Sequence, residues 1–185
     1  VPDGVAGATD YLFLEGYLSH TPTATAAFER AARLCRANGG KAGIALSDPF
    51  CVDRHRTDFR RLVRELDYVI GNEHEWESLY QTDLSAALEI AAADAGLVVC
   101  TRSGADVVLV QGDVEVVVPV NRVTPVDATG AGDQFAAGFL YGLATGRTLD
   151  VAGRMGCVAA AEVISHYGAR PEADLRALFR DHGLI

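Results

Sequence analysis

The chain has 185 residues, of which 49% are hydrophobic and 22% are charged, and its formal net charge is −9 at pH 7. This composition is typical of one globular domain with a sizeable core, which we expect to extend over residues 1–185. The acidic balance argues against a binder of nucleic-acid polymers or membrane surfaces, because both need a basic footprint. A single nucleotide is not excluded, since its phosphates need only local donors.

The first half of the chain alternates short apolar runs with helical patterns. The sequence predicts strands at 11–14, 43–46, 67–70 and 97–100, and helices at 23–37, 52–66, 73–80 and 85–95. Short apolar strands that alternate with helices are typical of a parallel sheet with helices on both faces. In such folds ligands bind at the carboxyl ends of the strands.

The second half begins with a predicted hairpin and continues with helices. Two β-branched arms, 107–110 and 114–120, flank a Gln-Gly-Asp turn at 111–113. Helices are expected at 131–144, 149–166 and 172–181. We therefore expect an α/β fold with a mostly parallel sheet, helices on both faces and a late antiparallel hairpin.

The cysteines and the apolar runs bear on the compartment. The four cysteines form no C-x-x-C pair, which is typical of free thiols in a reducing cytoplasm and not of disulfides or a zinc site. No apolar run approaches the roughly 18 residues of a membrane span, and no signal peptide is visible. We expect a cytoplasmic protein. Because the chain does not begin with methionine, we also expect a fragment.

A glycine-rich turn that leads into a helix dominates the second half. Thr129, Gly130, Ala131 and Gly132 have small side chains, and a helical pattern follows. Such a turn aims unpaired N–H groups at one point, where the helix dipole also favours negative charge, so it predicts a phosphate site. Asp133 follows in the first helical turn. It would stand beside the phosphate with a hydroxyl or a metal ion between them, or it would simply cap the helix.

Further polar residues follow predicted strands. Asn72 and Glu75 share one face of a helix start, where they would hold a hydrated Mg²⁺ or form a capping box. Thr101, Arg102 and Gly104 follow the fourth strand and face the same crevice, with Arg102 either on a phosphate or in solvent.

These motifs carry a resemblance. The run Asp127-Ala-Thr-Gly-Ala-Gly-Asp133, followed by Phe135-Ala-Ala-Gly138, resembles the C-terminal signature of the ribokinase-like (PfkB) family of carbohydrate and nucleoside kinases. The resemblance implies that Asp133 is the catalytic base and that the amides of Gly130, Ala131 and Gly132 form an anion hole. The run from Asn72 to Glu75 is similar to the family's Asn-x-x-Glu motif, which is associated with magnesium and phosphate.

The same resemblance implies ATP and Mg²⁺ as cofactors, with Glu75 contacting Mg²⁺ through water. It implies that Asp127 binds a monovalent cation such as K⁺, together with a turn near 167–169, unless Asp127 serves only an Asx-turn. The chain departs from the family at Ser103 and Asp106, where glycines are usual, and at Cys157, where many members carry an asparagine near the adenine. The implied nucleotide-binding residues are Asn72, Glu75, Thr101, Arg102, Gly104, Thr129, Gly132 and Cys157.

The runs 46–50 and 67–72 look more like the adenosine kinase branch than the sugar kinases, with Phe50 suited to a nucleobase or to the core. We therefore expect an ATP-dependent kinase of a nucleoside hydroxyl. A sugar kinase of the ribokinase, fructokinase or 2-keto-3-deoxygluconate kinase type and a non-catalytic nucleotide-binding fragment are the alternatives. The family's N-terminal lid and acceptor site do not lie in this chain, so the resemblance leaves the acceptor, the cation and a homodimer through the lid open. Alone, the 185 residues are expected to bind ATP weakly.

Overall fold

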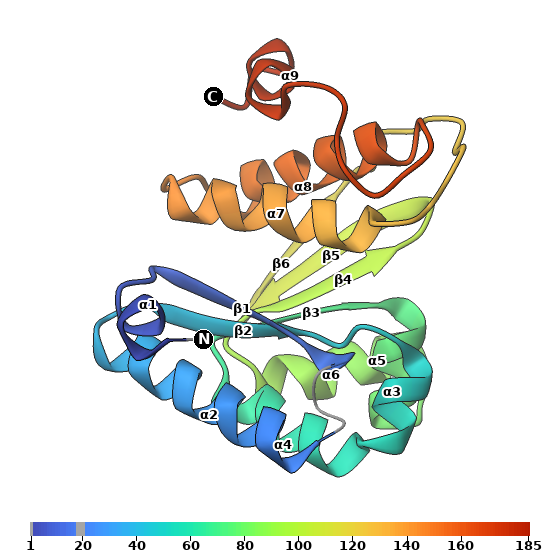
Figure 1. Cartoon of the computed structure of the whole chain (residues 1–185). Helices are drawn as coiled ribbons and strands as arrows, with labels where there is room; N and C mark the ends of the chain where they lie inside the picture. Colours follow the sequence, from blue (N-terminus) through green and yellow to red (C-terminus); the bar gives the residue numbers. More distant parts are fainter. Residues whose placement is uncertain (1, 18–20) are drawn as a thin grey trace. The chain divides into compact units, whose positions relative to one another are not determined.

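The computed structural model describes residues 2–17 and 21–185, and the chain divides into two compact units. The first unit comprises Val1–Thr101 and Val110–Glu115, and the second comprises Arg102–Leu109 and Val116–Ile185. Six strands form one sheet whose order follows the chain, from β1 to β6 (Figure 1). The α/β class is as expected.

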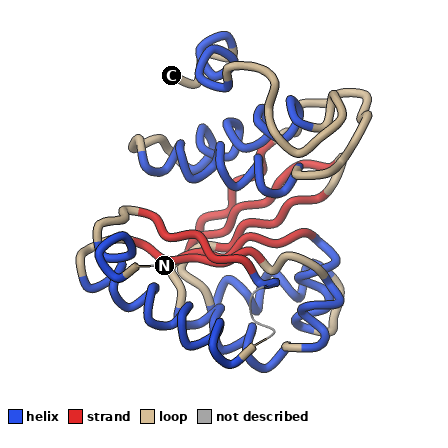
Figure 2. The backbone as a smooth tube through the Cα atoms, viewed as in Figure 1, coloured by secondary structure: helices blue, strands red, loops and turns tan. Residues whose placement is uncertain are grey.

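The first unit is built on parallel strands. The strands β1 (Tyr11–Glu15), β2 (Lys41–Ala45), β3 (Tyr68–Asn72) and β4 (Val98–Arg102) pair in parallel with their successive neighbours. Figure 2 shows these strands side by side with helices next to them. Because the strands are parallel, their carboxyl ends lie at one edge, where Asn72 stands opposite Thr101 in the register.

The first unit contains helices of five to 16 residues, several of which begin at a capping side chain. They are α1 (Asp3–Gly7), α2 (Pro22–Ala37), α3 (Pro49–Arg54), α4 (Arg56–Glu65), α5 (Glu73–Tyr80) and α6 (Leu84–Asp94). Thr21 and Asp83 cap α2 and α6 through their side-chain oxygens. In Figure 1, α2, α4 and α6 lie on the same side of β1, β2 and β3. Between sheet and helices lies a core that includes Leu14, Ile44, Phe59, Val69, Trp76 and Val99.

The second unit combines parts of the last two strands with three helices. It contains most of β5 (Ala105–Gln111) and β6 (Val114–Val118), which form the expected hairpin through Gly112-Asp113, and α7 (Ala131–Ala144), α8 (Leu149–Val163) and α9 (Leu175–Asp181). The helices α7 and α8 run side by side (Figure 1). A core cluster holds α9 against them through Met155, Val158, Ala159, Phe179 and Leu184.

Three sequence expectations were wrong. The helix expected at 52–66 is two helices, α3 and α4, because Asp48 caps a helix that starts at Pro49 and the backbone breaks at His55 (φ −121°, ψ 27°). The helix expected to reach His166 ends at Val163, and the last helix begins at Leu175, where Asp174 caps it.

Among the described helices, none is long and apolar enough to cross a membrane.

Candidate functional site

The start of α7 has the geometry that the glycine-rich turn predicts. Gly130 adopts φ +81°, and a Cβ atom there would lie 2.9 Å from both the Cβ and the carbonyl oxygen of Ala169. Only glycine meets both the left-handed backbone and this close approach without strain. The 14 residues of α7 begin directly after it.

Two backbone amides at this helix start are available to a ligand. The N–H of Ala131 donates to the carbonyl oxygen of Ala128 at 3.2 Å, whereas no hydrogen bond within the described residues involves the N–H of Gly132 or Asp133. Both residues are exposed, and a Cβ on Gly132 would meet nothing within 4 Å. Unpaired donors beside open space fit an anionic oxygen.

Asp133 does not cap α7. The N-cap position belongs to Gly130, and no side chain makes a cap hydrogen bond there. The exposed carboxylate of Asp133 instead stands in the first turn of the helix, next to the unpaired amides. An uncommitted carboxylate at this place can accept a proton from a hydroxyl that approaches the same anion site.

Asp127 ties the entrance of the loop to a distant turn. Its Oδ1 accepts hydrogen bonds from the N–H and Oγ1 of Thr129, at 2.9 and 2.7 Å, so the Asx-turn is present. Its Oδ2 accepts the N–H of Gly168 at 3.1 Å. The Thr129 hydroxyl, and then the two amides, hold the pKa of Asp127 below its usual value. The expected turn at 167–169 therefore lies beside Asp127, and its cation remains a prediction.

In the first unit, Asn72 and Glu75 form a reciprocal capping box at the start of α5. Asn72 Oδ1 accepts the N–H of Glu75 at 3.0 Å, and Glu75 Oε2 accepts the N–H of Asn72 at 2.8 Å. The Asn72 amide also donates to Glu75 Oε1 at 2.6 Å. Both oxygens of Glu75 are therefore committed to Asn72, so this carboxylate suits a contact with Mg²⁺ through water better than a direct one.

Glu75 is the one charged residue that the described core buries, with 5% of its surface exposed. Burial raises its pKa to about 7, against the amide of Asn72, which lowers it, and the nearby carboxylate of Asp48 adds to the rise. The group is thus poised between its two protonation states near neutral pH.

The connection between β4 and β5 is shorter than the sequence predicts. Thr101 and Arg102 belong to the strand itself, and only Ser103 (φ +51°) and Gly104 connect it to β5. The side chain of Arg102 is partly buried and not fully solvated. A two-residue connection presents few amides, so any phosphate contact in this place is confined to Ser103 and Gly104 and the side chains before them.

Cys157 lies on α8 with 4% of its surface exposed. Burial, and to a smaller extent the nearby Asp106, raises the pKa of its thiol to about 11, so the thiol is neutral. Its suggested place near adenine remains a prediction.

Each unit thus assembles part of the predicted site. In the first, Asn72, Glu75 and Thr101 meet at the carboxyl edge of the sheet. In the second, Asp127 and Thr129 join the start of α7. No group of three or more His, Cys, Asp or Glu residues in the described part of the chain is placed to hold a metal ion.

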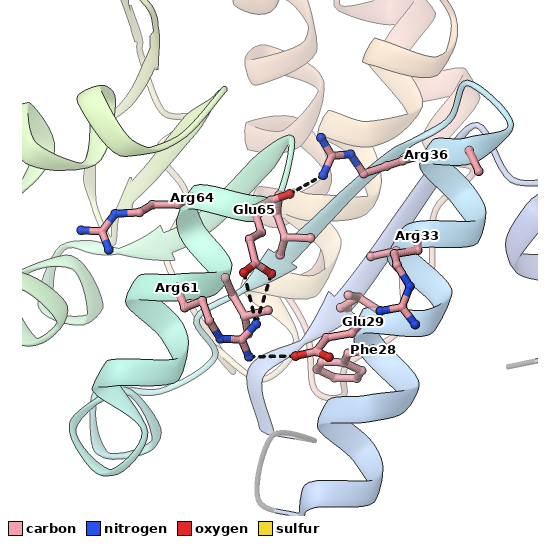
Figure 3. Close-up of a pocket in the computed structure, with 12 residues that line it drawn as sticks. Phe28, Glu29, Arg33, Arg36, Arg61, Arg64 and Glu65 are labelled. Carbon is pink, nitrogen blue, oxygen red and sulfur yellow. Dashed lines mark hydrogen bonds and ion pairs between the residues drawn. The ribbon is translucent and has the colours of Figure 1, made fainter.

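A groove of about 710 Å³ lies elsewhere in the first unit, between α2 and α4, and none of the predicted site residues lines it. Figure 3 shows Arg61 between the carboxylates of Glu29 and Glu65, and Arg36 reaching the backbone of Glu65. The charge of Arg61 is therefore largely neutralised by these two acids.

Three comparisons with known proteins show which proteins the chain resembles. A family model described as pfkB family carbohydrate kinase matches residues 4–175. The solved structure of a probable sugar kinase from Rhizobium etli is 40% identical with a TM-score of 0.97, and the match covers 100% of this chain and 57% of that one. An adenosine kinase from Sinorhizobium meliloti is 39% identical with a TM-score of 0.95, covering 98% and 57%.

Among curated proteins, adenosine kinase 1 of Arabidopsis thaliana is 30% identical over 148 residues, which is 71% of this chain and 43% of that protein. The chain therefore spans about half the length of the relatives that it matches.

Proposed function

Because the chain belongs to the pfkB family of carbohydrate kinases, we propose that it forms the nucleotide-binding part of an ATP-dependent kinase that phosphorylates a hydroxyl group of a nucleoside. The observation that carries this proposal is the start of α7, where the unpaired amides of Gly132 and Asp133 adjoin the free carboxylate of Asp133. Donors for a phosphoryl group and an acceptor for a proton stand together there.

The chemistry follows from these groups. Asp133 accepts the proton of the substrate hydroxyl while the hydroxyl oxygen bonds to the γ-phosphorus and the bond to ADP breaks. The amides at the start of α7 stabilise the charge that builds on the phosphoryl oxygens. The resemblance assigns this anion hole to Gly130, Ala131 and Gly132. The geometry favours the amides of Gly132 and Asp133, since that of Ala131 already has a partner.

Mg²⁺ would neutralise the phosphate charge, held mainly by phosphates and water, and the resemblance assigns Asn72 and Glu75 to contacts with it. Asp127 would supply a carboxylate oxygen to a monovalent cation such as K⁺. The described part of the chain supports this with the turn at Gly168 and Ala169, which lies against Asp127 and Gly130.

The acceptor proposal rests on residues at the start of α3. Phe50 is 69% exposed, and the Arg54 guanidinium lies 5.8 Å from the centre of its ring. An exposed ring offers a stacking surface to a nucleobase. Oδ1 of Asp48 caps α3 by accepting the amides of Phe50 and Cys51, so this oxygen of the carboxylate is committed to the helix start.

A sugar kinase is the second candidate. It is favoured by the 40% identity to the probable sugar kinase of Rhizobium etli over the whole chain. The two candidates share the phosphoryl-transfer chemistry and differ only in the acceptor.

The test is ADP formation by the full-length protein that carries this chain, with MgATP and K⁺, against adenosine, ribose, fructose and 2-keto-3-deoxygluconate. We expect turnover with adenosine. Turnover with one of the sugars alone would favour the second candidate. ATP binding without turnover on any of the four acceptors would contradict the kinase proposal and favour a non-catalytic nucleotide-binding protein.

A further inference from the structure

Glu162, near the end of α8, carries a largely enclosed carboxylate that no sequence motif indicated. Its side chain is 9% exposed. Its Oε1 accepts the backbone N–H groups of Glu172 and Ala173, each at 2.8 Å, and Nε2 of His166 lies 3.3 Å from the same oxygen. One carboxylate oxygen therefore holds both ends of the segment between His166 and Ala173, which we call the 166–173 turn.

The 166–173 turn lies against residues 119–130, which lead from β6 into α7 and which we call the phosphate-binding loop. Its Gly168 donates its N–H to Asp127 Oδ2 at 3.1 Å. Its Ala169 stands so close to Gly130 that a Cβ atom on Gly130 would lie 2.9 Å from it. The turn thus contacts the loop at Asp127, near its entrance, and at Gly130, the N-cap of α7.

The loop is also held at its entrance, because the N–H groups of Val126 and Asp127 donate to the carbonyl oxygen of Ile164 at 2.7 and 3.4 Å. Between the end of β6 at Val118 and the start of α7 at Ala131 the chain forms no helix or strand. Within this stretch, Asp127 carries the link onward, because its second oxygen accepts the amide and the hydroxyl of Thr129. A displacement of the 166–173 turn would reach the start of α7 through these contacts.

We propose that Glu162 is a positioning residue for the phosphate-binding loop. By holding the 166–173 turn, it keeps Asp127 and Gly130 in place, and with them the unpaired amides of Gly132 and Asp133. The effect of Glu162 on catalysis rests on the proposed kinase function. The contacts that link Glu162 to the loop do not depend on that function.

The packing of the unit is largely independent of Glu162. The helices α8 and α9 are held by the apolar cluster around Met155 and Phe179. Glu172 and Ala173 are exposed, so water can replace the carboxylate on their amides. A variant without this carboxylate should therefore fold while its turn loses its anchor.

The main test compares Glu162→Ala, Glu162→Gln and Met155→Ala in the full-length protein by calorimetric binding of MgATP, well below each unfolding midpoint. We expect Glu162→Ala to weaken binding at least about tenfold, because the amides lose their orientation. Glutamine still offers one oxygen to both backbone amides, so Glu162→Gln should stay within about threefold of the wild type. Met155→Ala removes core packing only and should lower the unfolding midpoint without changing the dissociation constant beyond about threefold.

A second readout needs no nucleotide. Amide hydrogen exchange at Gly168 and Thr129 should be at least about tenfold faster in Glu162→Ala, while the amides of α9 keep their protection. Unchanged exchange at both amides would overturn the inference, and so would faster exchange with unchanged MgATP affinity, or equal weakening by Met155→Ala. If the wild-type protein binds no MgATP, the proposed function fails, and the exchange rates alone decide whether Glu162 positions the loop.

Discussion

A Cβ atom on Gly138 would lie 2.6 Å from the carbonyl oxygen of Met155. This distance is shorter than real contacts allow, so α7 and α8 approach each other as closely as they do because residue 138 has no side chain. The same holds one turn later, where a Cβ atom on Gly142 would lie 2.7 Å from the Cα atom of Ala152. The small residues of the two helices therefore set their separation.

Gly138→Ala should destabilise the protein by about 1–3 kcal/mol, even though alanine favours the helix by up to about 1 kcal/mol. The free energy of unfolding in urea measures the effect. Gly4→Ala is the control, because a Cβ on Gly4 meets nothing within 4 Å. A Gly138→Ala variant as stable as the wild type would show that the two helices can separate at no cost.

Gly132→Ala should separate stability from binding. The position is helical and sterically open, so alanine should stabilise α7 by about 0.5–1 kcal/mol. Its methyl group would stand where the phosphoryl oxygens approach the amides, so MgATP affinity should fall at least about tenfold. Thermal unfolding and calorimetric binding check the two effects. Unchanged affinity would mean that the start of α7 is not the phosphate site.

Glu75→Gln should change the pH dependence of stability. The pKa of Glu75 is raised from 4.5 to about 7, so the folded state binds the proton more tightly than the unfolded chain. Its contribution is fully favourable below about pH 4.5 and is lost as the pH rises to about 7, by at most about 3 kcal/mol. The glutamine variant has no carboxyl group to titrate at this position. Its free energy of unfolding should therefore rise relative to that of the wild type as the pH increases from about 4.5 to about 7.

Urea unfolding at several pH values measures this difference, with Glu89→Gln, an exposed acid on α6, as the control. The difference for the control should be flat. A flat or falling difference for Glu75→Gln would mean that the carboxyl group is not desolvated in the folded protein.

The sequence predicts those elements well whose ends carry local signals. The helices α5 and α7 lie at the expected residues, because Asn72 with Glu75 and the left-handed Gly130 mark their starts. The helix at 52–66 was predicted wrongly, because its apolar spacing outweighed Asp48 and Pro49, which are strong helix-start signals.

The candidate site also has parts that local sequence signals predict and parts that they do not. The glycine-rich start of α7 and the capping box at Asn72 are readable from neighbouring residues. The contact of Gly168 with Asp127 spans 41 residues, and nothing local to Glu162 shows that its carboxylate will hold amides ten and eleven residues later. Such contacts depend on how the chain returns after α8, which periodicity does not encode.

We propose above all that Asp133 accepts the proton of the acceptor hydroxyl at an anion site formed by the start of α7. The most direct test is the steady-state rate of Asp133→Asn in the full-length protein, together with its dissociation constant for MgATP. Asp181→Asn, an exposed acid at the end of α9, is the matched control. We predict a loss in kcat well beyond tenfold for Asp133→Asn, with MgATP affinity within about threefold of the wild type. A loss below about tenfold, or ~1.4 kcal/mol in the barrier, would contradict the assignment.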